Sequence, residues 1–103
     1  MKRYGVYIMC SRARDGALYT GMSGYIPGRA EQHAGLKEGG AKWALKYKAR
    51  HLVYYEIVND YLLAREREEK IKKYDRAVKL DMIGRFNPAW TDLREDLAWK
   101  LAQ

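Results

Sequence analysis

Apolar and polar side chains alternate in two short stretches near the N-terminus, at residues 4–10 and 17–22. Both stretches are rich in Tyr, Val, Ile and Leu, and a period of two with this composition is typical of β-strands. Asp15-Gly16 is a turn signal, so residues 11–16 are expected to form a hairpin loop. The N-terminal region is therefore predicted to contain two paired strands.

Each of these predicted strands places a tyrosine close to a glycine. Because side chains alternate along a strand, Tyr7 shares a face with Gly5, and Tyr19 shares one with Gly21. A hairpin folded near Ala13 would bring the two tyrosines roughly opposite each other. The two phenolic hydroxyls would then lie above a part of the sheet that the glycines leave without side chains. A phosphate backbone could approach such a surface closely.

The remaining hydrophobic pattern predicts one further strand and several helices. Residues 52–58 are almost continuously apolar, which favours a central strand covered on both faces. Capping and stop signals predict helices at about residues 27–34, from Asn59 or Asp60 to Lys73, from Asp75 to Gly84, and from Thr91 or Asp92 onward. The fold class is therefore α/β, with a small three-stranded, mainly antiparallel sheet flanked by helices.

Length and composition narrow the class of protein. A chain of 103 residues is expected to form a single domain, residues 1–103, and a composition that is 48% hydrophobic and 32% charged is typical of a globular protein. No apolar run approaches the roughly 20 residues needed to cross a bilayer, and no signal peptide is recognisable. The single cysteine, Cys10, excludes an internal disulfide and a thiolate metal cluster. A cytoplasmic protein is the simplest interpretation.

The positive charge is concentrated in one half of the sequence. The net charge is +7, and residues 1–50 hold 10 Lys and Arg against 3 Asp and Glu, whereas the rest of the chain is balanced. A one-sided basic excess favours a polyanionic partner such as nucleic acid. Charge that serves only solubility is the alternative.

Two cationic side chains are spaced to project from one side of the first predicted helix. Arg29 and His33 are separated by four residues. Arg29 offers a planar fork of donors suited to phosphate oxygens, and His33 can carry a proton near neutral pH. Each residue taken alone also fits a solvated surface side chain, and the spacing does not separate these alternatives.

One acidic residue of the next helix lies on its apolar stripe. At roughly 100° per residue, Glu68 falls in line with Tyr61, Ala64 and Ile71, whereas Glu66 and Glu69 point away. A carboxylate that faces the packed side needs compensation by a cation or by hydrogen bonds. Glu68 is therefore either a metal ligand or the partner of Lys72 in a salt bridge within the helix.

These residues, in this order, resemble the GIY-YIG nuclease superfamily, and most of all its small stand-alone bacterial members related to the excision-repair nuclease domain. Gly5-Val6-Tyr7 and Tyr19-Thr20-Gly21 match the two halves of the name motif, and Arg67 to Lys72 matches the segment of the metal-binding glutamate. Gly40 to Trp43, Leu52 to Glu56 and Asn87 to Trp90 match further features of the small members. The sequence departs from the family at Ile26-Pro27-Gly28, and at Met22, where some active relatives carry lysine.

The resemblance implies cleavage of DNA with a single Mg²⁺ or Mn²⁺ ion, and a place in DNA repair or recombination. Tyr7 and Tyr19 would handle the proton of the nucleophile and position the phosphate, Arg29 would stabilise the transition state, and Glu68 would bind the metal. His33 would assist. Four basic residues would follow the DNA backbone with little sequence specificity: Lys42, Lys46, Lys48 and Arg50.

Two other functions are compatible with the same sequence. A catalytically inactive nucleic-acid-binding module would keep the basic surface without the cleavage activity. A protein-interaction domain would use Trp90, Trp99 and the last helix as its binding surface. Aromatic side chains at helical spacing usually belong to the core, so this last interpretation is the weaker one.

Overall fold

Three antiparallel strands form the sheet of the protein. The computed structural model describes residues 3–12, 16–24 and 51–101. Strand β1 covers Tyr4–Cys10, β2 covers Leu18–Gly24 and β3 covers His51–Val58, in the spatial order β2-β1-β3. The predicted α/β fold with a three-stranded antiparallel sheet is confirmed.

The prediction that the third strand is central was wrong, because β1 occupies the middle of the sheet and β3 lies at an edge. The apolar run in β3 has another cause. Val53 packs into the hydrophobic cluster on one face of the sheet, and Tyr55 packs into the cluster on the other face. Helices thus cover both faces of this edge strand, and burial on two faces requires apolar side chains wherever a strand lies in its sheet.

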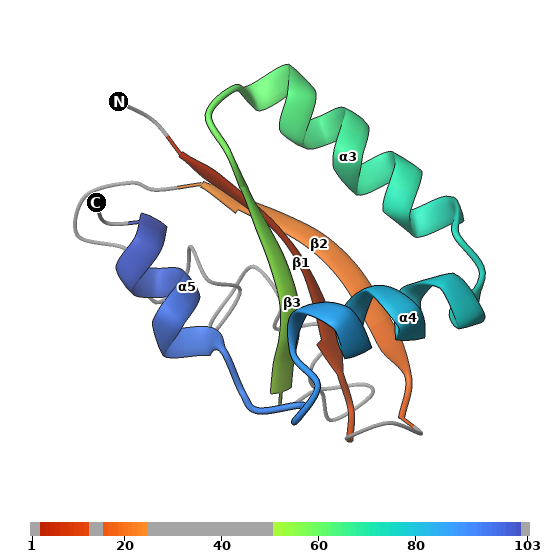
Figure 1. Ribbon diagram of the computed structural model, residues 1–103. Helices are drawn as coiled ribbons and strands as arrows, with labels where there is room; N and C mark the ends of the chain where they lie inside the picture. Colours follow the sequence, from red (N-terminus) through yellow and green to blue (C-terminus); the bar gives the residue numbers. More distant parts are fainter. Residues whose placement is uncertain (1–2, 13–15, 25–50, 102–103) are drawn as a thin grey trace.

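Helices divide the two faces of the sheet between them (Figure 1). Helices α3, Tyr61–Lys73, and α4, Arg76–Phe86, follow β3 directly and cover one face, whereas α5, Arg94–Leu101, covers the other. Among the described residues, no helix is long and apolar enough to span a membrane.

The predicted starts of two helices are confirmed by their caps. The side chain of Asp60 accepts a hydrogen bond from the backbone N–H of Leu63, and Asp75 accepts one from Val78. Each carboxylate satisfies a backbone donor that has no partner inside its helix. The short polar residues before each apolar stripe therefore marked where the chain turns helical.

The end of α4 differs from the prediction, since the helix continues through Gly84 to Phe86. The backbone N–H of Asn87 still bonds to the carbonyl of Ile83, and the buried side chain of Asn87 then stops the chain. Its amide donates to the carbonyls of Val53 and Thr91, and its oxygen accepts from Thr91. These four bonds satisfy the buried amide and hold the chain in the non-helical conformation that follows Phe86.

The last helix begins at Arg94, slightly later than the sequence predicted. Asp92 nevertheless organises its start, because its carboxylate accepts from the backbone N–H of Arg94 and also from that of Leu52. Leu97 and Leu101 are buried, whereas Trp99 is 62% exposed. Helix α5 is thus tied to the first residues of β3 as it crosses the sheet.

Candidate active site

Tyr7 and Tyr19 lie side by side on the sheet face that α5 covers, with ring centroids 6.5 Å apart. They are diagonal neighbours, because Tyr7 pairs with Gly21 while Tyr19 pairs with Met9. The sequence predicted that they lie roughly opposite each other, and the observed pairing is offset by two residues. The loop sets this register, since the backbone N–H of Ser11 bonds to the carbonyl of Ala17.

Gly21 makes room for both tyrosine rings. A Cβ atom at this position would lie 2.8 Å from the hydroxyl oxygen of Tyr7 and 3.0 Å from Cε1 of Tyr19. Any side chain here would displace the Tyr7 hydroxyl. The ring of Tyr7 therefore lies across the backbone of β2 and directs its hydroxyl toward that edge of the sheet.

Gly5 has a different role from the one the sequence suggested. A Cβ atom at Gly5 would lie 2.9 Å from Cδ1 of Leu97, so α5 already fills the space above this glycine. The expectation that both glycines clear a floor for phosphate is contradicted at Gly5. Gly5 allows α5 to pack closely on the sheet, and Gly21 leaves space for the two tyrosine rings.

Glu68 lies on the buried stripe of α3, as predicted. Its side chain is 15% exposed, whereas that of Glu69 is 61% exposed. Ala64 and Ile71, which flank it on the stripe, are fully buried. The ammonium group of Lys72 lies 3.4 Å from the Glu68 carboxylate, so the salt bridge expected as the alternative to metal binding is present.

The electrostatics of Tyr7 link it to Tyr19 and to Glu68. Burial raises the pKa of the Tyr7 hydroxyl well above its ordinary value, and the neighbouring Tyr19 and the charge of Glu68 raise it further. Helix α3 packs on the opposite face of the sheet, against β1 and the edge strand β2. The charge of Glu68 thus influences Tyr7, although the helix that carries Glu68 packs on the other face of the sheet.

Six further residues singled out from the sequence lie outside the described residues: Arg29, His33, Lys42, Lys46, Lys48 and Arg50. They belong to the segment between β2 and β3. Their placement relative to the tyrosines and Glu68 stays a prediction.

Comparison of the sequence with known protein families gives a match over most of the chain. The family model described as the GIY-YIG catalytic domain matches residues 3–81. The chain belongs to the GIY-YIG family. It is 37% identical over 83 residues to the UPF0213 proteins of Staphylococcus aureus strains Mu50, N315 and MW2, and the match covers 81% of this chain and 96% of each relative. No solved structure matches the chain significantly.

Membership in the GIY-YIG family indicates the general class of activity. The domain is of the nuclease type and its substrate is nucleic acid. Nucleases of this family generally use divalent metal ions. The two tyrosine motifs and the helix with Glu68 all fall within the matched residues.

The donors of this GIY-YIG domain fit a magnesium-like ion held jointly with a substrate. The described residues contain no group of three or more His, Cys, Asp or Glu able to hold a metal ion. Mg²⁺, however, is usually bound by one or two carboxylates together with phosphate oxygens and water. Glu68 supplies one half-buried carboxylate of that kind. A single hard oxygen ligand is therefore compatible with an ion that is completed by a phosphodiester.

Two polar groupings of the GIY-YIG domain were missed by the sequence analysis. Glu56 on β3 forms an ion pair with Arg67 on α3, and the hydroxyl of Tyr55 donates to Asp96 on α5. Lys100 lies over the ring of Tyr55, 5.3 Å from its centroid. A signal for the first grouping was present, because Glu56 is the one charge inside the apolar run of β3. The second depended on how α5 crosses the sheet.

Proposed function

We propose that this domain is a divalent-metal-dependent endonuclease that hydrolyses phosphodiester bonds in DNA with little sequence specificity. The observation that supports the proposal is the pair of adjacent tyrosines, Tyr7 and Tyr19, with the charge of Glu68 acting on Tyr7. Two hydroxyls and one carboxylate are groups that can move a proton and hold a phosphate-bound cation. Family membership supports the same reaction class. By the same resemblance we propose a role in DNA repair or recombination.

Tyr7 and Tyr19 differ in what they can contribute. The pKa of Tyr7 is raised, first by burial, so its hydroxyl keeps its proton near neutral pH and acts as a hydrogen-bond donor. Only 2% of Tyr7 is exposed, whereas Tyr19 is half-buried. A water molecule reaches Tyr19 more easily. We therefore assign phosphate positioning to Tyr7 and contact with the attacking water to Tyr19.

The other charged groups act on the phosphate. A divalent cation bound at Glu68 would withdraw charge from a phosphate oxygen. Arg29 stabilises the charge that develops in the transition state, and His33 assists proton transfer or phosphate contact. Lys42, Lys46, Lys48 and Arg50 follow the DNA backbone, a contact that weakens steeply with added salt. These assignments rest on the sequence and on the family resemblance.

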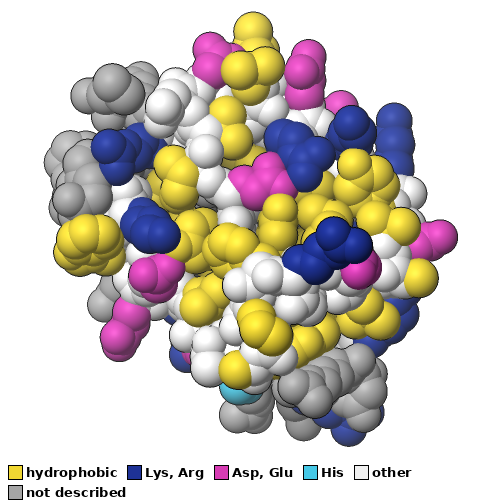
Figure 2. Space-filling model, viewed as in Figure 1, with side chains coloured by type: hydrophobic (Ala, Val, Ile, Leu, Met, Phe, Trp, Pro, Cys, Tyr) yellow, Lys and Arg dark blue, Asp and Glu magenta, His cyan; other side chains and the backbone are white. Residues whose placement is uncertain are grey.

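The charge distribution supports this location of the DNA contacts. On the face seen in Figure 2, acidic and basic side chains of the described residues lie interspersed around exposed hydrophobic groups, without a continuous basic surface. The excess of positive charge is carried by residues 1–50. The backbone contacts are therefore assigned to that half of the sequence.

The decisive experiment compares cleavage of labelled single-stranded and double-stranded DNA by the wild type and by Glu68→Ala, with Mg²⁺ or Mn²⁺. We expect Glu68→Ala to lower the rate by about 100-fold or more, the scale for removing one group that stabilises transition-state charge. Glu69→Ala is the matched control, because its carboxylate lies on the same helix but is exposed. Equal rates for wild type and Glu68→Ala would reject the site.

A catalytically inactive nucleic-acid-binding module is the second candidate. The salt bridge from Lys72 favours it, because a cation already compensates Glu68. The same experiment separates the two candidates. Salt-sensitive DNA binding without metal-dependent cleavage, even at high protein concentration, would support the inactive module.

A further inference from the structure

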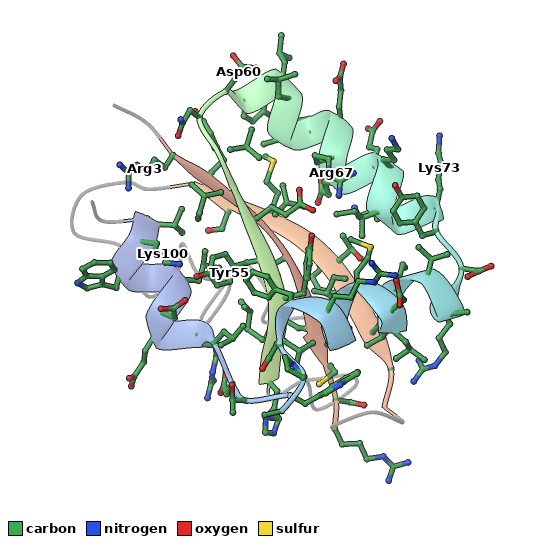
Figure 3. The ribbon with its side chains drawn as sticks, viewed as in Figure 1. Arg3, Tyr55, Asp60, Arg67, Lys73 and Lys100 are labelled. Carbon is green, nitrogen blue, oxygen red and sulfur yellow. The ribbon has the colours of Figure 1, made fainter. Side chains whose placement is uncertain are left out.

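A half-buried ion pair joins α3 to the far edge of the sheet. The guanidinium of Arg67 donates two hydrogen bonds to the carboxylate of Glu56, with Nε–Oε1 and Nη2–Oε2 distances of 2.8 and 2.6 Å. The hydroxyl of Tyr54 donates to the same carboxylate. Figure 3 shows Arg67 reaching from α3 toward the sheet. We call Glu56, Arg67 and Tyr54 the β3 clamp.

The ion pair of the β3 clamp is shorter and less exposed than the Arg65–Glu69 pair of the same helix. The side chains of Arg67 and Glu56 are 33% and 23% exposed, whereas those of Arg65 and Glu69 are 49% and 61% exposed and lie 3.6 Å apart. Burial alone would raise the pKa of Glu56, but the hydrogen bonds from Arg67 and Tyr54 outweigh it and lower the pKa. The carboxylate therefore stays ionised, and the two-pronged geometry fixes the orientation of Arg67.

The position of the β3 clamp bears directly on Glu68. Arg67 and Glu68 are consecutive, so their side chains leave the helix about 100° apart. Arg67 reaches β3 at one edge of the sheet. Helix α3 as a whole packs mainly against β1 and β2, and the charge of Glu68 acts on Tyr7 of β1. The fully buried residues of the described helix are two, Ala64 and Ile71, so its apolar contact with the sheet is narrow. Locking Arg67 therefore fixes the rotation of α3 and hence the direction of the Glu68 carboxylate.

We propose that Glu56 and Arg67 are positioning residues that hold Glu68 in the orientation required to bind a divalent ion beside the tyrosines. The proposal rests on the proposed function, because that function assigns the metal to Glu68. Groups that orient a metal ligand without touching the ion typically contribute about 10-fold to 100-fold in metal affinity.

The test measures Mn²⁺ binding in the presence of dimethyl phosphate, an unreactive phosphodiester that can complete the coordination of the ion, from the paramagnetic broadening of amide resonances around Glu68. We expect Arg67→Gln to weaken binding of Mn²⁺ at Glu68 by about 10-fold or more. Arg65→Gln, which removes an exposed arginine from the same helix, should bind like the wild type. Arg67→Lys should fall between them, since lysine keeps the charge but loses the fork.

Further variants and outcomes keep the proposal open to rejection. If Arg67→Gln does not fold, Glu56→Gln removes the charge while keeping the shape, and it should show the same loss of Mn²⁺ affinity. Equal Mn²⁺ affinity in the folded clamp variants and in Arg65→Gln would overturn the proposal, as would a wild type without broadening near Glu68. A wild type that binds Mn²⁺ at Glu68 but does not cleave DNA would contradict the proposed nuclease and leave the positioning role standing.

Discussion

The two faces of the sheet are built from different kinds of side chain. The face under α3 and α4 is mainly aliphatic, and its buried residues include Val6, Ile8, Ala64, Ile71 and Ile83. The face under α5 instead buries Tyr7 and Tyr55, with Tyr19 packed against them. An aliphatic core obtains its stability from burial alone. Buried phenols add hydroxyls that lose contact with water, and this cost is greatest on the second face, where Tyr7 and Tyr55 are almost completely buried.

The tyrosines of the α5 face divide further into two roles. Tyr55 pairs with Tyr7 across the strands, yet its hydroxyl donates to Asp96 of α5 (Figure 3 labels Tyr55 beside Lys100). That bond ties the helix to the sheet. The hydroxyl of Tyr7 lies instead beside Gly21, at the β2 side, where the charge of Glu68 acts on it. Neighbouring tyrosines on one face therefore differ: Tyr55 has a structural bond at β3, and Tyr7 belongs to the site proposed at β2.

The largest expected effect is a loss of stability without a loss of activity, caused by a substitution on the aliphatic face. Ile83→Ala removes a fully buried side chain of α4 and should lower the free energy of unfolding by about 2–5 kcal/mol. Urea denaturation measures this loss. DNA cleavage per folded molecule should stay near that of the wild type, because α4 contributes no group to the proposed site. A large loss of cleavage in the folded variant would contradict the division between the two faces.

The next prediction compares the two glycines of the α5 face. Gly21→Ala pushes the Tyr7 hydroxyl aside and should lower the cleavage rate by about 100-fold, the scale for misplacing a reacting group by 1 Å. Gly5→Ala, the matched control, displaces Leu97 and should cost about 1 kcal/mol of stability with little change in cleavage. Similar cleavage rates in the two variants would mean that the Gly21 space has no catalytic use.

The smallest effect concerns the dependence of stability on pH. The pKa of Glu56 is lower in the folded protein than its ordinary value of 4.5. The ionised carboxylate therefore stabilises the fold fully at pH values above 4.5. This stabilisation is lost as the pH falls through the lowered pKa. The free energy of unfolding of the wild type should exceed that of Glu56→Gln at neutral pH, and the difference should shrink toward about pH 2. A difference that does not change with pH would show that the charge of Glu56 contributes nothing.

Much of the fold followed from local chemistry. The alternating stretches predicted β1 and β2, and the capping residues Asp60 and Asp75 marked the starts of α3 and α4. Helical periodicity placed Glu68 on the buried stripe and Glu69 on the exposed side. These features could be predicted because they depend on residues within a few positions of each other.

The place of β3 and the space above Gly5 were predicted wrongly because they depend on distant parts of the chain, whereas the exact hairpin register depends on how one loop closes. The apolar run of β3 reflected burial by α4 and α5, and burial of a strand does not specify its place in the sheet. The hairpin register depended on how Ser11 and Ala17 close the loop. The space above Gly5 is filled by Leu97, which is far away in the sequence.

The sequence by itself determined the strands, the helix starts, the inward carboxylate and the family to which these motifs belong. The tertiary structure decided which groups interact. Tyr7 lies against Gly21 and Tyr19, the charge of Glu68 raises the pKa of Tyr7, and Arg67 pairs with Glu56. The physical reason is the range of the interactions. Periodicity and capping act within one or two turns of backbone, whereas a site is made of contacts between strands and helices that only packing brings together.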